Sequence, residues 1–179
     1  MAQIVLYSDT SAYNFNYLSL PNKAAGVYRL ATELRQYGYT VQVINHLFSL
    51  TYKENMELCD RHIDQHTIAV GFSTTFWYPN EEMKDYGMGL IADIIHHMNL
   101  KAPQAKLIVG GTNMAEIEFI NKHKKIDMRF LGYSESAVLQ YLTGNKHEFD
   151  FTKSQIIYDK SDGILPGETL TIETARGCI

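Results

Sequence analysis

Residues 67–75 have the sequence TIAVGFSTT. The first seven form a short apolar run rich in β-branched residues, which is typical of a strand buried on both faces of a sheet. Thr74 and Thr75 follow directly, and the aromatic run Phe76–Tyr78 comes next. A connector with this polar and aromatic content is a candidate for function, because loops carry binding residues more often than core elements do.

Similar apolar runs lie on both sides of this one, and helical periodicity fills the segments between them. Gly38 stands where a helix C-cap glycine belongs, and Ser134 where an N-cap belongs. The sequence predicts an α/β domain: a flavodoxin-like (Rossmann-like) five-stranded parallel sheet with helices on both faces, plus a C-terminal extension. The predicted strands are 3–7, 39–45, 67–73, 105–109 and 127–131, and the predicted helices are 22–37, 47–63, 88–98, 113–123 and 134–142.

The composition is that of a globular protein with one core. The chain has 179 residues, of which 45% are hydrophobic and 20% charged. Its 16 Lys and Arg against 20 Asp and Glu form no basic stripe, so we expect no direct nucleic-acid partner. No apolar run approaches the roughly 20 residues that span a bilayer, and residues 1–7 lack a leader pattern, so we expect a cytoplasmic chain without membrane contact. With two cysteines, reduced thiols and a buried Cys59 are expected.

The pattern changes near residue 144. Residues 1–143 are predicted to form the α/β domain, and residues 144–168 a polar, turn-rich linker with one strand-like piece at Ser154–Tyr158. Residues 169–179 contain an alternating run, Thr169–Thr174, which predicts the first strand of a further domain.

Candidate binding residues lie after three of the predicted strands. Because ligands of parallel sheets sit beyond the carboxyl ends of the strands, these residues are expected to meet at one edge. Their hydroxyl groups, turn glycines and helix N-terminus can hold a polar tail or phosphate. The alternative is structural: the hydroxyls cap helices, the glycines permit tight turns, and the carboxylate pairs with a helix dipole. The residues are Ser73, Thr74, Thr75, Gly110, Gly111, Thr112, Gly132, Ser134 and Glu135.

Several common chemistries lack support. The seven histidines do not combine with Cys or carboxylates at metal-ligand spacing. No dinucleotide-binding or nucleoside-triphosphate glycine motif occurs, and no nucleophile stands beside a recognisable base. The aromatic run at 76–78 has two open interpretations, because it can stack on a flat cofactor or close a domain interface.

The order of four short motifs resembles the cobalamin (vitamin B12)-binding domain that precedes the catalytic domain in radical S-adenosylmethionine enzymes. The resemblance covers residues 1–142, and in the last motif Tyr133 and Ser134 replace part of the family's Gly-Glu-Gly-Glu. It implies a corrinoid held by the candidate residues at the strand ends. The motifs are Gly38–Val41, Val70–Thr75, Leu107–Gly111 and Phe130–Glu135.

The tail LPGETLTIETARGCI, residues 165–179, resembles the first strand of a radical S-adenosylmethionine barrel and the start of its cluster loop. In that family Arg-Gly-Cys begins a C-x-x-x-C-x-x-C motif, whose three thiolates hold a [4Fe-4S] cluster that binds S-adenosylmethionine. The resemblance implies that Cys178 is a cluster ligand. It places the cluster and S-adenosylmethionine in a full-length parent, because this chain carries only one of the three cysteines.

Residues 9–26 contain no histidine, whereas the methionine-synthase type of this domain supplies a cobalt ligand there through D-x-H-x-x-G. The expected function is the cobalamin-binding domain of a radical enzyme, for example a methyltransferase, with its barrel in cis or in trans. One alternative is a cofactor-free scaffold or docking module that pairs through Thr169–Thr174. Another is a flavin-binding domain, for which Ser8–Ser11 is a partial phosphate loop.

Overall fold

The computed structural model describes residues 2–10, 23–75, 81–111, 114–148 and 155–163. Its centre is a five-stranded, all-parallel sheet with the strand order β2-β1-β3-β4-β5. The predicted flavodoxin-like α/β fold is confirmed. The strands are β1 (Ile4–Tyr7), β2 (Val41–Ile44), β3 (Ala69–Ser73), β4 (Lys106–Gly110) and β5 (Met128–Phe130).

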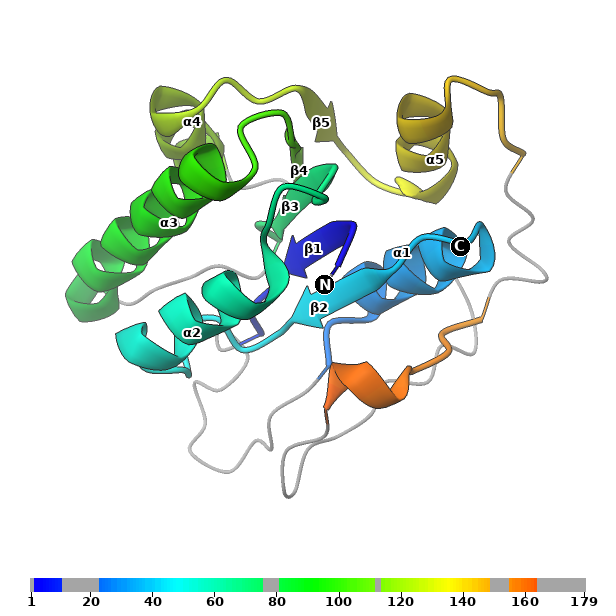
Figure 1. Ribbon diagram of the computed structural model, residues 1–179. Coiled ribbons are helices and arrows are strands. Elements are labelled where there is room, and N and C mark those ends of the chain that lie inside the picture. The colour runs from blue at the N-terminus through cyan, green and yellow to red at the C-terminus, as the bar shows by residue number, and fades with distance from the viewer. Residues whose placement is uncertain (1, 11–22, 76–80, 112–113, 149–154, 164–179) are drawn as a thin grey trace, which may run out of the picture.

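Helices cover both faces of the sheet, as Figure 1 shows. Two helices, α1 (Ala25–Gln36) and α5 (Glu135–Thr143), pack on one face. Three others, α2 (Tyr52–His62), α3 (Glu81–Lys101) and α4 (Met114–His123), pack on the opposite face. None of the helices in the described ranges is long and apolar enough to cross a membrane.

Strand alternation divides the core into two clusters. Ile4 and Leu6 of β1 face α1 and α5, whereas Val5 and Tyr7 face the other three helices. Successive side chains of a strand point to opposite faces, so a strand buried on both faces is apolar throughout. This is why the central strands appear in the sequence as continuous apolar runs.

Helix α1 ends as predicted at Gly38. The φ of Gly38 is +90°, its N–H donates to the Arg35 carbonyl, and the N–H of Tyr39 donates to the Leu34 carbonyl. A left-handed glycine after the last helical residue satisfies carbonyls that the helix leaves without partners.

Three predicted elements differ most from the structure. The helix predicted over 88–98 is longer at both ends, and α3 runs from Glu81 to Lys101. The helix predicted from residue 47 begins at Tyr52, because residues before it form a turn in which the Phe48 N–H donates to the Asp9 carboxylate at 2.8 Å. Residues 155–158, in the predicted strand-like piece, belong to no strand; Ile156 and Tyr158 pack against the core on the α1 side instead. A 3-10 helix, η2 (Lys160–Asp162), follows them.

Candidate functional site

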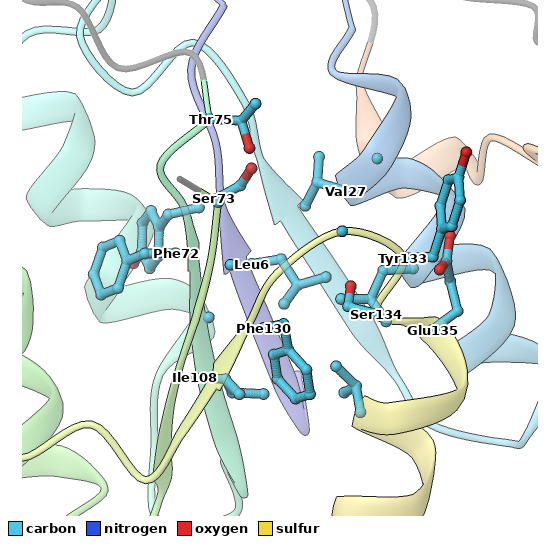
Figure 2. A pocket seen from close by; sticks show the side chains of 18 of the residues that line it. Leu6, Val27, Phe72, Ser73, Thr75, Ile108, Phe130, Tyr133, Ser134 and Glu135 are labelled. Atoms are coloured by element: carbon cyan, nitrogen blue, oxygen red, sulfur yellow. The ribbon is translucent and has the colours of Figure 1, made fainter. Parts of the chain in front are cut away.

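A cavity of about 370 Å³ lies between α1 and α5, at the carboxyl ends of the central strands. It is close to the point where the strand order reverses between β1 and β3, the usual ligand position in open parallel sheets. Figure 2 shows the side chains that surround it.

The cavity exists because one face of β3 and β4 carries very small residues. Leu6 and Ile108 point toward α1 and α5, and by strand alternation Gly71, Ser73 and Gly110 lie on the same face. A Cβ atom on Gly71 would lie 2.7 Å from Leu6 Cδ2, so Leu6 fills the space over that residue. A Cβ atom on Gly110 would meet nothing within 4 Å, which leaves the hollow open farther along the strands.

The cavity has apolar walls and a polar rim. In Figure 2, Leu6, Ile108 and Phe130 form one wall, and the hydroxyl groups of Ser73 and Thr75 lie together at the strand ends. Small-molecule sites commonly have this composition, with mostly apolar walls and a few polar groups that set the orientation of the ligand.

Most of the predicted binding residues converge on this cavity. Thr74 does not line it, because its side chain is buried and its hydroxyl donates to the Gly110 carbonyl at 3.1 Å. Thr112, Cys178 and the aromatic run at 76–78 lie outside the described residues. The residues that line the cavity are Ser73, Thr75, Gly110, Gly111, Gly132, Ser134 and Glu135.

Gly111 allows the loops after β3 and β4 to touch. Its φ is +113°, and a Cβ atom there would lie 2.6 Å from Thr74 Oγ1 and 2.7 Å from the Thr75 nitrogen. At this glycine it is therefore a second loop, including its backbone, that comes close. Together with the Thr74 hydrogen bond, this contact holds the two loops in register at the rim.

The turn between β5 and α5 forms another part of the rim. Gly132 adopts a φ of +74°, and Ser134 occupies the N-cap position of α5 but makes no capping hydrogen bond with its side chain. Glu135, the first residue of α5, is buried, and its carboxylate lies 3.9 Å from Nε of Arg29 on α1. A buried ion pair therefore joins the two helices that enclose the cavity.

Sequence reasoning missed the α1 and strand contributions to the wall. Ala25, Gly26, Val27 and Leu30 of α1 line the cavity, as does Phe130. Apart from glycine, these residue types look like ordinary core positions, so no sequence signal distinguishes a wall residue from a packed one.

Behind the sheet, Tyr7 and Phe72 stack with ring centroids 5.2 Å apart, and the Tyr7 hydroxyl lies 3.0 Å from Sγ of Cys59. Cys59 is buried, as predicted, and burial raises the pKa of its thiol to about 11. Such a thiol is protonated and inert at neutral pH.

Among the described residues, no group of three His, Cys, Asp or Glu side chains is placed to hold a metal ion.

No protein-family model matches the sequence, and no curated protein matches it. Among solved structures, an acetyl xylan esterase (Est2A) from the rumen bacterium Butyrivibrio proteoclasticus is similar with 12% identity and a TM-score of 0.41. The similarity covers 72% of this chain and 54% of the esterase, so the chain spans about half the length of that protein. A likeness this distant carries no conclusion about function.

Proposed function

We propose that this chain binds a cobalamin-type corrinoid, with the aromatic base of the cofactor's nucleotide tail in the cavity between α1 and α5. The observation that carries the proposal is the cavity itself, whose rim is built from seven of the nine candidate binding residues. Its apolar wall suits a flat aromatic base, and its rim hydroxyls suit the sugar and phosphate that follow it.

The glycines and the volume of the cavity also fit the nucleotide tail of a corrinoid. Gly110 stands at the rim, where a Cβ atom would meet no protein atom within 4 Å, and Gly26 on α1 has equally open surroundings. Small-molecule pockets range from about 300 to 1,000 Å³, and 370 Å³ lies near the lower limit. A cavity of this size holds the tail of a large cofactor rather than its macrocycle.

In this proposal the chain binds and orients the cofactor and keeps water from its tail. The corrinoid supplies the chemistry when bound, for example methyl transfer in a parent radical enzyme. The partner barrel, its [4Fe-4S] cluster and S-adenosylmethionine rest on the resemblance of residues 165–179, with Cys178 as the first cluster ligand.

A flavin is the second candidate. The strand order β2-β1-β3-β4-β5 is that of flavodoxin, in which the mononucleotide binds where the order reverses between β1 and β3. The same titration separates the two ligands, because it can be run with flavin mononucleotide.

The test is a calorimetric and absorbance titration of the full chain with hydroxocobalamin, methylcobalamin and flavin mononucleotide. A Gly110→Val variant should lose corrinoid binding by at least about tenfold, because its side chain occupies space that the tail needs. Gly89→Val is the matched control: Gly89 is exposed on α3, and a Cβ atom there also meets nothing within 4 Å.

Saturable corrinoid binding that is weakened at Gly110 and unchanged at Gly89 supports the proposal. Saturable binding of the flavin alone transfers the site to the second candidate. If none of the three ligands binds at high micromolar concentration, the proposal is rejected, and the cofactor-free scaffold is the remaining interpretation.

A further inference from the structure

Strand β2 forms one edge of the sheet, and its outward-facing carbonyl groups accept hydrogen bonds from side chains. The Thr40 carbonyl accepts from Ile4 N–H, and the Ile44 carbonyl accepts from Ser8 N–H, so both face β1. Successive carbonyl groups along a strand point to opposite sides, so the carbonyls of residues 41 and 43 point away from the sheet. Edge groups of this kind readily pair with a strand of another chain.

The side chains of Arg35 and Gln42 donate hydrogen bonds to these carbonyls. Arg35 Nη2 donates to the Val41 carbonyl at 2.8 Å, and Gln42 Nε2 donates to the Val43 carbonyl at 2.9 Å. A long polar side chain over an edge carbonyl takes the place that a neighbouring strand's N–H would need.

The same two side chains hold a segment that lies far along the sequence. Arg35 binds both carboxylate oxygens of Asp162, at 2.9 and 2.7 Å, and the Asp162 side chain is only 1% exposed. Gln42 Nε2 also donates to the Ser161 carbonyl at 3.1 Å. A bidentate pair between a guanidinium and a carboxylate is among the stronger and more directional polar contacts in proteins.

A second set of contacts involves Tyr28 and Thr32 of α1, which do not line the cavity. The Ile157 N–H donates to Thr32 Oγ1 at 2.9 Å, and Tyr158 packs edge-on against Tyr28 with ring centroids 5.1 Å apart. The Lys23 ammonium lies 4.8 Å from the centroid of the Tyr28 ring and 3.5 Å from the Asp162 carbonyl. Residues within 155–163 thus make aromatic, hydrogen-bonded and charged contacts with α1 and with Lys23 just before it.

The segment also has its own internal structure. The Ser161 N–H donates to Asp159 Oδ1 at 2.8 Å, and the Asp159 N–H donates to Asp162 Oδ2 at 2.8 Å, which closes a capping box around η2. Asp162 therefore serves the turn and the Arg35 pair at once. Figure 1 shows η2 beside β2 and α1.

We propose that residues 155–163 form a latch that covers the open edge of β2 and prevents strand pairing there. The latch is independent of the proposed corrinoid site, because the residues of α1 and β2 that it contacts do not line the cavity. It extends the folded domain through residue 163.

Hydrogen exchange of the full chain, with sedimentation velocity on the same samples, tests the latch. In Asp162→Ala, the Ile157 and Ser161 amides should exchange about ten- to a hundredfold faster than in the unchanged protein, since a charge-assisted contact is lost. The variant should also self-associate at concentrations where the unchanged protein is monomeric. Arg35→Lys keeps the positive charge but loses the two-pronged geometry, and should show the same changes to a smaller degree.

Asp60→Ala is the matched control, because Asp60 lies on α2, across the sheet, and its side chain is 65% exposed. It should leave exchange at 155–163 and the sedimentation profile unchanged. The proposal is overturned if the Ile157 amide of the unchanged protein exchanges as fast as in a free peptide. It is equally overturned if Asp162→Ala releases the segment without promoting self-association.

Discussion

At the scale of the residue, the candidate site depends on what is missing from a few side chains. Ser73 and Gly110 leave a hollow on one face of β3 and β4, and Gly111 lets the loops beyond them touch. The two adjacent glycines have different roles. Gly110 borders open space, whereas Gly111 is in tight contact and has a positive φ.

We expect Gly111→Ala to lower the free energy of unfolding by at least about 2 kcal/mol. Backbone strain at a positive φ and the overlap with Thr74 each cost about 1–3 kcal/mol. Urea denaturation measures the change. Gly110→Ala is the control and should stay within about 1 kcal/mol of the unchanged protein, because its new methyl group meets no neighbour. Equal stability of the two variants would show that the loops do not touch at Gly111.

At the scale of the element, α1 and α5 are joined across the cavity by Arg29 and Glu135. Their side chains are 3% and 4% exposed, and their charged groups are 3.9 Å apart. Removing one member of a buried ion pair leaves the other charge buried with fewer compensating contacts, which is more costly than removing both.

Glu135→Ala should therefore destabilise the protein by about 1–3 kcal/mol, because the buried Arg29 guanidinium loses the Glu135 carboxylate. The double variant Arg29→Met, Glu135→Leu should recover most of that loss in denaturant melts. Glu57→Ala is the control, since its pair with Lys53 on α2 is exposed and should contribute less than about 1 kcal/mol. A double variant that is less stable than Glu135→Ala would mean that the pair is a net source of stability.

At the scale of the whole molecule, the buried Tyr7 and Cys59 pair connects β1 to α2 and links unfolding to alkaline pH. Burial raises the pKa of the Cys59 thiol to about 11, whereas a thiol in an unfolded chain has a pKa of about 8.5. The unfolded state therefore loses its proton first as the pH rises. Burial also raises the pKa of Tyr7, which adds to the effect at higher pH.

We expect the free energy of unfolding to be constant with respect to Cys59 below pH 8 and to fall between about pH 8.5 and 11. The full loss is on the order of 3 kcal/mol, from the difference between the two pKa values. Denaturation at stepped pH measures it. Cys59→Ala should remove this part of the slope, and an unchanged slope would assign the alkaline loss to other groups.

The sequence was sufficient for the fold class, the strand order along the chain, the buried Cys59 and the helix end at Gly38. Each of these depends on local patterns: short apolar runs, helical periodicity and a glycine after a helix. The alternation in 154–158 shows the limit of such patterns. Alternation reports only that one face of a segment is covered, and here Ile156 and Tyr158 pack beside α1 without joining the sheet.

The candidate site was likewise predictable from the sequence only in part. Sequence alone identified the strand-end glycines and hydroxyls, because parallel strands end at one edge whatever their order. Only the tertiary structure decided that Thr74 holds two loops together, that Glu135 faces Arg29, that α1 forms a wall, and that residues 155–163 cover β2. The physical reason is that these contacts join residues far apart in the chain, and their geometry depends on how the helices pack on the sheet.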